Sequence, residues 1–348
     1  MGTKYFFAEN ILIAESFFIA LIVLLTYLSK SYYVLKNTIT QKIRLKIQIE
    51  NFLKSATLKP HNFNLSIFPK NWQRLDLLIE VTQETDSTNT FNEWTKIRAG
   101  FIKKIIFPLA RNMAIRRNWI SRLYAARAFC LLKGGANEEY IIKLTNDKIP
   151  LVFLYAARAA VIHDSEKAIF SIIKKMASES WTEQSIFLQA FDDFTNQTYS
   201  IIEKILATEM SPNIRSTCYE ILCEHVSGPI KWDMTQDLTS KNSRLKIAAL
   251  KFYAKPEPDS AIPVLIANLK DPEVEVRLIA LHRLQMLKAK QAISEITVCL
   301  DDSDWWVRIS ACEALKSLGK EGADAIAAHK PELEKVDFNF THLKNTWW

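Results

Sequence analysis

A hexapeptide that occurs twice constrains the fold of this chain more than any other feature of its sequence. LYAARA stands at 123–128 and again at 154–159, a step of 31 residues. Continued at that step, its first alanine leads to a series of small or apolar residues: Ala125, Ala156, Phe187, Cys218, Ala249, Ala280 and Ala311. A period kept this long predicts a row of structural repeats rather than one compact core.

Each repeat is predicted to be a pair of helices. The residues four positions after the small series are also apolar, namely Phe129, Ala160, Phe191, Leu222, Tyr253, Leu284 and Leu315. A spacing of four lines one face of a helix, and an earlier helical run such as EKAIFSIIKKM precedes this helix in several repeats. One hairpin cannot bury both faces, so neighbours must stack. We therefore expect an all-α fold, an α-solenoid of helical hairpins.

Two segments make the resemblance specific. Residues 269–277 read LKDPEVEVR and residues 300–308 read LDDSDWWVR. Both resemble HEAT repeats of the short variety, about thirty residues long, that is named for phycobilisome lyases. The resemblance covers about residues 113–328.

The resemblance implies how successive repeats are joined. In these repeats the aspartate of the turn and the arginine of the second helix link neighbouring hairpins, which here assigns repeat packing to Asp271, Arg277, Asp302 and Arg308. The position of Asp271 is occupied by Ser240, Glu209 and Ser178 in the middle repeats. We therefore expect the ladder of linked residues to be interrupted there.

A second constraint lies near the N-terminus. Ile11–Leu28 is an apolar run whose one strong charge is Glu15, long enough for a transmembrane helix. Lysines and arginines follow it without an acid until Glu50, which favours an N-terminus outside and a cytoplasmic C-terminal part. A cleaved signal peptide is the alternative, but Tyr27–Lys30 lacks the small residues of a cleavage site. Glu15 either pairs with another membrane helix or reaches water from one turn inside the interface.

These patterns predict five segments in the chain. They are a transmembrane anchor at 1–30, a cytoplasmic helical stalk at 31–60, an irregular N-terminal helical cap at 61–112, repeats of period 31 at 113–330, and a C-terminal tail at 331–348.

A cluster of cations is the main candidate for binding. No acidic residue lies between Glu93 and Glu138, whereas ten basic residues do. The candidates for partner or lipid binding are Lys96, Arg98, Lys103, Lys104, Arg111, Arg116 and Arg117, with Arg122, Arg127 and Lys133 nearby. Such a cluster can hold anionic lipid headgroups, an acidic protein surface or nucleic acid phosphates, or it can be an ordinary solvated face. Because it follows the predicted anchor, a membrane surface or membrane partner is favoured and nucleic acid is not.

Trp305 and Trp306 are the second candidate for binding. They stand at the start of a predicted second helix, where at least one ring is expected to be exposed, as in interface anchors. Alternatively, the terminal Trp347 and Trp348 cover them.

The sequence offers little for catalysis. His163 and His225 occupy the same repeat position two repeats apart, but no spacing supplies a third metal ligand, so both are interpreted as helix-end residues. The five cysteines form no CxxC pair and are interpreted as buried side chains of a protein in a reducing compartment. No phosphate-binding glycine loop or nucleophile elbow occurs. We expect no catalytic residue, metal or cofactor.

The resulting hypothesis is a membrane-anchored cytoplasmic scaffold that binds a protein partner. The general look resembles bacterial membrane HEAT proteins associated with envelope polysaccharide glycosyltransferases, which implies a membrane enzyme as the partner. Two alternatives stay open: a phycobilin-lyase-like enzyme that attaches a bilin to a cysteine, and a HEAT solenoid that binds nucleic acid through the basic cluster.

Overall fold

The computed structural model describes a largely helical chain. The described residues are 24, 25, 36, 39, 40, 43–51, 73–88, 92–134, 137–178, 187–225, 230 and 232–329. All regular elements in this part are helical, with no strand, so the all-α prediction is confirmed there. The chain divides into two compact units, unit 1 (residues 1–140) and unit 2 (residues 141–348), each considered separately below.

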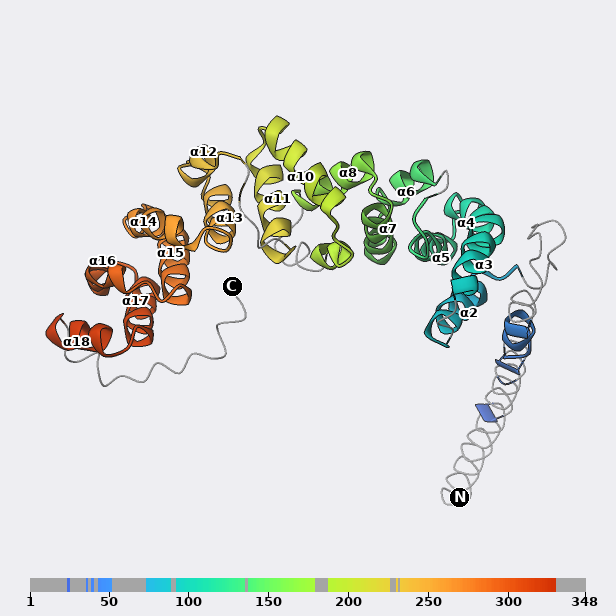
Figure 1. The fold of residues 1–348 in the computed structure, drawn as a ribbon, viewed down its shortest axis with the longest axis horizontal. Coiled ribbons are helices and arrows are strands. Elements are labelled where there is room, and N and C mark those ends of the chain that lie inside the picture. Colours follow the sequence, from blue (N-terminus) through green and yellow to red (C-terminus); the bar gives the residue numbers. More distant parts are fainter. Residues whose placement is uncertain are drawn as a thin grey trace, which may run out of the picture. The chain divides into compact units, whose positions relative to one another are not determined.

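Unit 1 contains a described helical segment at 43–51, inside the predicted stalk. Lys46 ties it to α2 through ion pairs with Glu80 at 3.2 Å and Glu84 at 2.6 Å, and Ile49 is fully buried. The labelled elements are α2 (Leu75–Thr88), α3 (Asn92–Phe101), the π-helical turn η2 (Ile102–Ile106), α4 (Phe107–Ala114) and α5 (Trp119–Phe129), while α6 (Glu138–Leu144) contains the boundary between the units (Figure 1).

The π-helical turn η2 has one buried face and one exposed face. The backbone stays helical through Phe101 and Phe107, so α3, η2 and α4 continue without a break. Ile102, Ile105 and Ile106 are buried, whereas Lys103 and Lys104 are exposed. The wider turn of a π-helix changes the register of everything after it, and such turns recur at functional positions.

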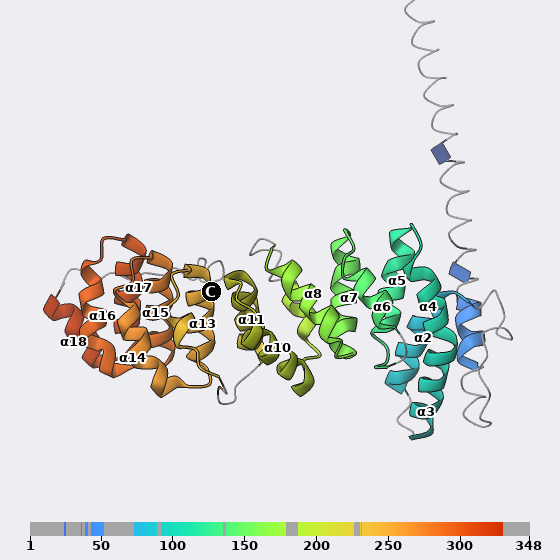
Figure 2. The same cartoon turned by 90° about the horizontal axis from the view of Figure 1, so that it is seen from above.

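Unit 2 consists of helical hairpins in succession. Its second helices α11, α13, α15 and α17 pack one upon the next, and α14, α16 and α18 form the other layer (Figures 1 and 2). The elements are α7 (Pro150–Ile162), α8 (Glu166–Met176), η3 (Gln189–Phe191), α10 (Asn196–Thr208), α11 (Pro212–His225), α12 (Thr235–Leu238), α13 (Ser243–Tyr253), α14 (Pro258–Asn268), α15 (Val274–Met286), η4 (Lys290–Ala292), α16 (Ile293–Val298), η5 (Cys299–Asp301), α17 (Trp305–Ser317) and α18 (Lys320–His329).

The predicted small series forms the buried seam of the second helices. Every member from Ala125 to Ala311 is buried, Phe187 being the most exposed at 6%. The companion series four residues later is buried as well, except that Tyr253 is half-buried. Small side chains allow the backbones of neighbouring second helices to approach closely, so the 31-residue period is a packing requirement.

The turn after the second helix also repeats. Asp164, Lys288 and Gly319 stand at the same repeat position and have φ angles of 50°, 50° and 84°. This left-handed residue ends a helix and lets the next backbone N–H turn back onto it. Accordingly, the N–H of Ala289 donates to the carbonyl of Leu284 at 3.1 Å.

A ladder of ion pairs links the second helix of one repeat to the turn of the next. Arg277 Nη2 donates to Asp302 Oδ1 at 2.8 Å, and Lys246 Nζ donates to Asp271 Oδ2 at 2.5 Å. Burial by itself would raise the pKa of Asp302, but the hydrogen bonds from Arg277 and the Asp304 N–H outweigh it, so this pKa lies below its usual value. Arg308 holds its own turn, donating to the carbonyls of Asp302 and Ser303 at 2.8 and 3.0 Å.

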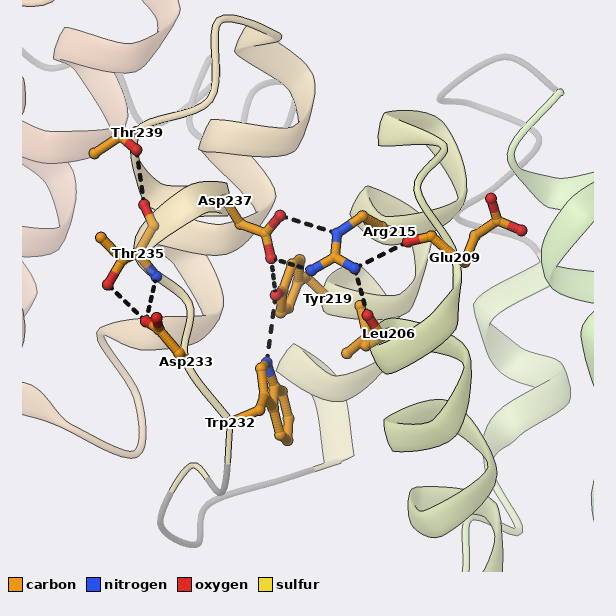
Figure 3. Close-up of polar contacts among 9 residues, drawn as sticks. All are labelled: Leu206, Glu209, Arg215, Tyr219, Trp232, Asp233, Thr235, Asp237 and Thr239. Carbon is orange, nitrogen blue, oxygen red and sulfur yellow. Dashed lines mark hydrogen bonds and ion pairs between the residues drawn. The ribbon is translucent and has the colours of Figure 1, made fainter.

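The expected interruption of the ladder at Ser240 is wrong. Arg215 Nη2 donates to Asp237 Oδ2 at 2.6 Å, with Asp237 three residues before the predicted position (Figure 3). The short helix α12 carries Asp237 into place, where the Tyr219 hydroxyl also donates to it, and Trp232 Nε1 donates to Tyr219 at 3.4 Å. A carboxylate from another position thus takes the role that spacing had assigned to residue 240.

The ladder changes its chemistry at Phe153, a position where five of the other six repeats place a cation and one has Gln184. Lys175 of α8 reaches over, its Nζ lying 4.1 Å from the centre of the Phe153 ring and donating to the Asp147 carbonyl at 2.9 Å. The Asp147 carbonyl lies six residues before Phe153. In the later repeat the equivalent carbonyl, that of Asp271, lies six residues before Arg277 and accepts from Arg277 Nη1. Lys175 therefore supplies the missing charge from a different helix.

Removing one partner of a buried rung should be costly. In the change Asp302→Ala, the guanidinium of Arg277 stays buried without its carboxylate, and we expect the free energy of unfolding to fall by about 3 kcal/mol. Urea denaturation of the full chain measures it. The control is Glu321→Ala in the Lys290–Glu321 pair, whose side chains are 60% and 62% exposed; it should cost less than about 1 kcal/mol. Equal effects of the two changes would contradict a stabilising ladder.

Candidate functional site

A row of polar side chains lies along the second helices of unit 2. Two positions after the small residue, every repeat carries a polar residue, and this set, the polar row, is Arg158, Gln189, Glu220, Lys251, His282 and Glu313. Two residues correspond to a rotation of about 200° about a helix axis. The row therefore points away from the buried seam, and its members are half-buried except for the exposed Gln189.

Glu220 on α11 is the most unusual member of the row. Its Oε1 has no contact with solvent and accepts no hydrogen bond from the described residues. Burial raises its pKa to about 7, although the charges of Arg244 and Lys251 act in the opposite direction. A buried carboxyl oxygen that accepts no hydrogen bond is uncommon in folded proteins, and it marks Glu220 as the candidate functional residue of the row.

Positive charge lies near this carboxyl group: Arg244 and Lys251 of α13 act on Glu220, and Arg283 of α15 acts on Lys251. Burial lowers the pKa of Lys251, and the nearby Arg283 lowers it further. Arg283 Nε is buried without a hydrogen-bond acceptor among the described residues, while its Nη1 contacts Met286 Sδ at 3.6 Å. Buried polar groups normally have partners, so this part of the row offers both donors and an acceptor that the chain itself leaves unused.

The polar row is not among the residues predicted from the sequence, although its signal is present there. The positions from Arg127 through Glu313, two residues after each member of the small series, are polar at every 31-residue step. What no periodicity could indicate is the unequal burial of the row, because exposure depends on how neighbouring helices pack.

The structure divides the predicted basic cluster into two groups. Lys96, Lys103, Lys104, Arg116 and Arg117 are exposed. Within the described part of the chain, no hydrogen bond or ion pair is formed by the side chains of these five.

The other two members of the cluster have structural contacts. Arg98 Nε donates to both carboxylate oxygens of Asp86 at 2.7 and 2.8 Å, and its Nη2 donates to the Leu131 carbonyl at 2.9 Å. Arg111 Nε donates to Asn137 Oδ1 at 2.9 Å. Arg98 and Arg111 thus hold unit 1 together.

Trp305 and Trp306 are both exposed, at 47% and 41%, as predicted for at least one of them. Their rings meet edge to face, with centroids 4.7 Å apart. Asp304 caps the helix by accepting from the N–H groups of Trp306 and Val307 at 2.9 and 3.2 Å, which fixes the start of α17. Trp347 and Trp348 lie outside the described residues.

The histidines and cysteines play structural roles. His163 is the C-terminal cap of α7, and His225 ends α11 and stacks on Phe194 with centroids 4.9 Å apart, so both are helix-end residues. Burial lowers the pKa of His225. Cys218, Cys223, Cys299 and Cys312 are buried and Cys130 is partly so; no disulfide joins them. Among the described residues, no group of three or more histidine, cysteine or carboxylate side chains is arranged to hold a metal.

The predicted anchor falls almost entirely on residues outside the described part. Only Leu24 and Leu25 of the run Ile11–Leu28 are described. No helix among the described residues combines the length and apolar character needed to cross a bilayer.

Comparison with known proteins supports the repeat assignment. Residues 262–329, from α14 to α18, match the family model for HEAT repeats, which confirms the predicted resemblance there. The crystal structure of an engineered protein from the Northeast Structural Genomics Consortium shares 16% identity, with 85% of this chain and 96% of that chain covered. Its TM-score of 0.34 is too low to carry an argument. No curated protein gives a significant match.

The buried carboxyl of Glu220 makes stability depend on pH. In the unfolded chain this group ionises around its ordinary pKa of 4.5, whereas in the folded chain it ionises at about 7. The folded state therefore binds the proton more tightly, and the free energy of unfolding falls as pH rises through that interval. Glu220→Gln removes this penalty. We expect it to raise the free energy of unfolding by about 1–3 kcal/mol near pH 8 and to have little effect near pH 4.

Glu224→Gln is the matched control, because Glu224 lies on the same helix but is exposed. It should change stability by less than about 0.5 kcal/mol at either pH. Thermal or urea unfolding at both pH values makes the comparison. A Glu220 variant that is less stable than the parent near pH 8 would contradict the burial argument.

Proposed function

We propose that this chain is a scaffold that binds a protein partner along the polar row. The observation that carries the proposal is the row itself: half-buried polar side chains from successive second helices, among which Glu220 has a buried carboxyl oxygen that accepts no hydrogen bond from the described residues. Repeat solenoids present extended surfaces of this kind, and HEAT repeats in general act as scaffolds for protein interaction. A partner's backbone and side chains would bind the partly exposed groups of the row.

The mixed charge of the row favours protein over nucleic acid. Glu220, Lys251 and His282 stand on successive second helices, and Glu313 follows. A phosphate backbone is bound by a stripe of uniform positive charge, and acidic members at two positions would repel it. A polypeptide, which offers both donors and acceptors, complements alternating charges.

The membrane part of the proposal rests on sequence. An apolar run at Ile11–Leu28, followed by basic residues, supports a single span with the N-terminus outside and both units in the cytoplasm. The partner would then be a protein at the same membrane, such as an enzyme of envelope polysaccharide synthesis. Chemistry by the chain itself is not part of the proposal. The phycobilin-lyase alternative predicts a coloured pigment that accompanies the purified chain.

Neutralising Lys251 of the row and Arg283 beside it should release the partner. The double change Lys251→Gln with Arg283→Gln removes two charges that form no ion pair with a carboxylate among the described residues. A stoichiometric partner should be isolated with the full parent chain in mild detergent. We expect the amount of this partner per chain to fall at least about tenfold in the variant. Quantitative mass spectrometry of the isolated complexes measures the ratio, and circular dichroism checks that the variant is folded.

The control is Lys270→Gln with Lys288→Gln, which removes the same charge from exposed residues outside the row. It should leave the partner bound. If the row variant is folded and retains its partner as the control does, the polar row is not the binding surface. A pigment that absorbs visible light in the purified chain would instead favour the lyase.

The predicted span makes a separate prediction. The full chain should stay in the membrane pellet after alkaline carbonate extraction, because an apolar helix of this length is held in the bilayer rather than by charge. A variant with Leu21→Lys and Leu25→Lys, which places charges in the run, should pass to the supernatant. A parent chain released by carbonate would contradict the span and leave the scaffold proposal untouched.

A further inference from the structure

The turn between α4 and α5 exposes six consecutive residues, Ile115–Ile120, which we name the tip. Three of them are large and apolar: Ile115 is 59% exposed, Trp119 43% and Ile120 44%. Arg116 and Arg117 stand between them and are exposed as well. Exposed apolar side chains interleaved with arginines are unusual for a surface that meets only water.

Backbone contacts hold the tip in a defined shape. Arg122 Nη1 donates to the Arg117 carbonyl at 2.6 Å and to the Arg116 carbonyl at 3.2 Å. Asn118 caps α5 by accepting from the Ile120 N–H at 3.0 Å, and the Arg116 N–H donates to the Met113 carbonyl at 3.2 Å. An ordered turn therefore holds the apolar side chains outward. They can enter an apolar layer without any rearrangement of the backbone.

The charge close to the tip in the sequence is of one sign. The acids nearest to Arg116 and Arg117 along the chain are Glu93 and Glu138. Lys96, Lys103 and Lys104 lie farther back on the same helical stretch of unit 1, so the two arginines are the exposed cations of the tip itself. An exposed pair of cations complements a layer of negative charge, and each cation near an anionic bilayer adds to the attraction.

Another repeat of the same chain provides a contrast. Trp305 and Trp306 occupy the repeat positions of Trp119 and Ile120, six steps of 31 residues later. They are exposed to a similar degree, but Asp301, Asp302 and Asp304 precede them, whereas the corresponding residues of the tip are Ile115, Arg116 and Asn118. The apolar feature is thus shared by both sites and only the sign of the neighbouring charge differs.

From this arrangement we infer that the tip docks onto an anionic lipid bilayer. Trp119, Ile115 and Ile120 enter the headgroup layer, and Arg116 and Arg117 bind lipid phosphates. A tryptophan with neighbouring aliphatic and basic side chains is the composition that partitions into this layer. The inference does not depend on the polar row or its partner, because it concerns a different unit. It orients unit 1 against the membrane surface.

Tryptophan fluorescence in vesicles with brominated acyl chains tests the inference directly. Bromine quenches only indoles that reach the bilayer, and the chain has no tryptophan before Trp72, so the run at 11–28 contributes no signal. The full chain is reconstituted in phosphatidylcholine vesicles with and without phosphatidylglycerol. We expect quenching in the anionic vesicles that is mostly lost in Trp119→Phe and unchanged in Trp305→Phe.

Charge reversal supplies the second arm. Arg116→Glu with Arg117→Glu should remove most of the Trp119 quenching in the anionic vesicles, because the tip loses its attraction to the lipid phosphates. Lys288→Glu with Lys320→Glu makes the same change in net charge at exposed residues of unit 2 and should have little effect. The inference is overturned if Trp119→Phe is quenched as strongly as the parent, or if quenching is equal with and without phosphatidylglycerol. Retention of the partner by the row variant, with Trp119 quenching as in the parent, would contradict only the scaffold proposal.

Discussion

The buried ion pair between one second helix and the turn of the next repeat is the interaction on which unit 2 depends. Each rung places a cation and a carboxylate where neither is well solvated, as in Arg277 with Asp302, whose side chains are 10% and 12% exposed. A lone charge at such a place is strongly unfavourable, so each repeat requires its neighbour. The small residues of the buried seam bring the helices close enough for the pairs to form.

Because the ladder and the seam occupy one side of the second helices, another side remains available. The polar row lies on this other side. Its central members Glu220, Lys251 and His282 come from successive second helices, and the ladder sets the spacing of these helices. The ladder thus holds polar groups of different helices at fixed separations. In the proposed scaffold this is the preorganisation that would lower the free-energy cost of binding a partner.

The two units differ in what they offer to a partner. The exposed cations of unit 1 are accompanied by apolar side chains at the tip, whereas the tryptophans at the same repeat position in unit 2 follow aspartates. The same repeat position can therefore stand beside charges of either sign, because the side chains at the start of α5 and α17 are exposed and are not packed in the core. Variation at such positions changes what the chain binds without affecting the core.

The sequence by itself determined the helical class, the 31-residue period and the buried seam, because each depends on residue spacing along the chain. The resemblance to HEAT repeats implied the rung between Arg277 and Asp302. The sequence also identified the exposed tryptophans. It could not show that Asp237 replaces the expected residue 240, that Lys175 compensates for Phe153, or that Arg98 and Arg111 serve packing while Arg116 and Arg117 stay in solvent. Those outcomes belong to the tertiary structure, because partner choice depends on which side chains of distant segments reach the same point in space.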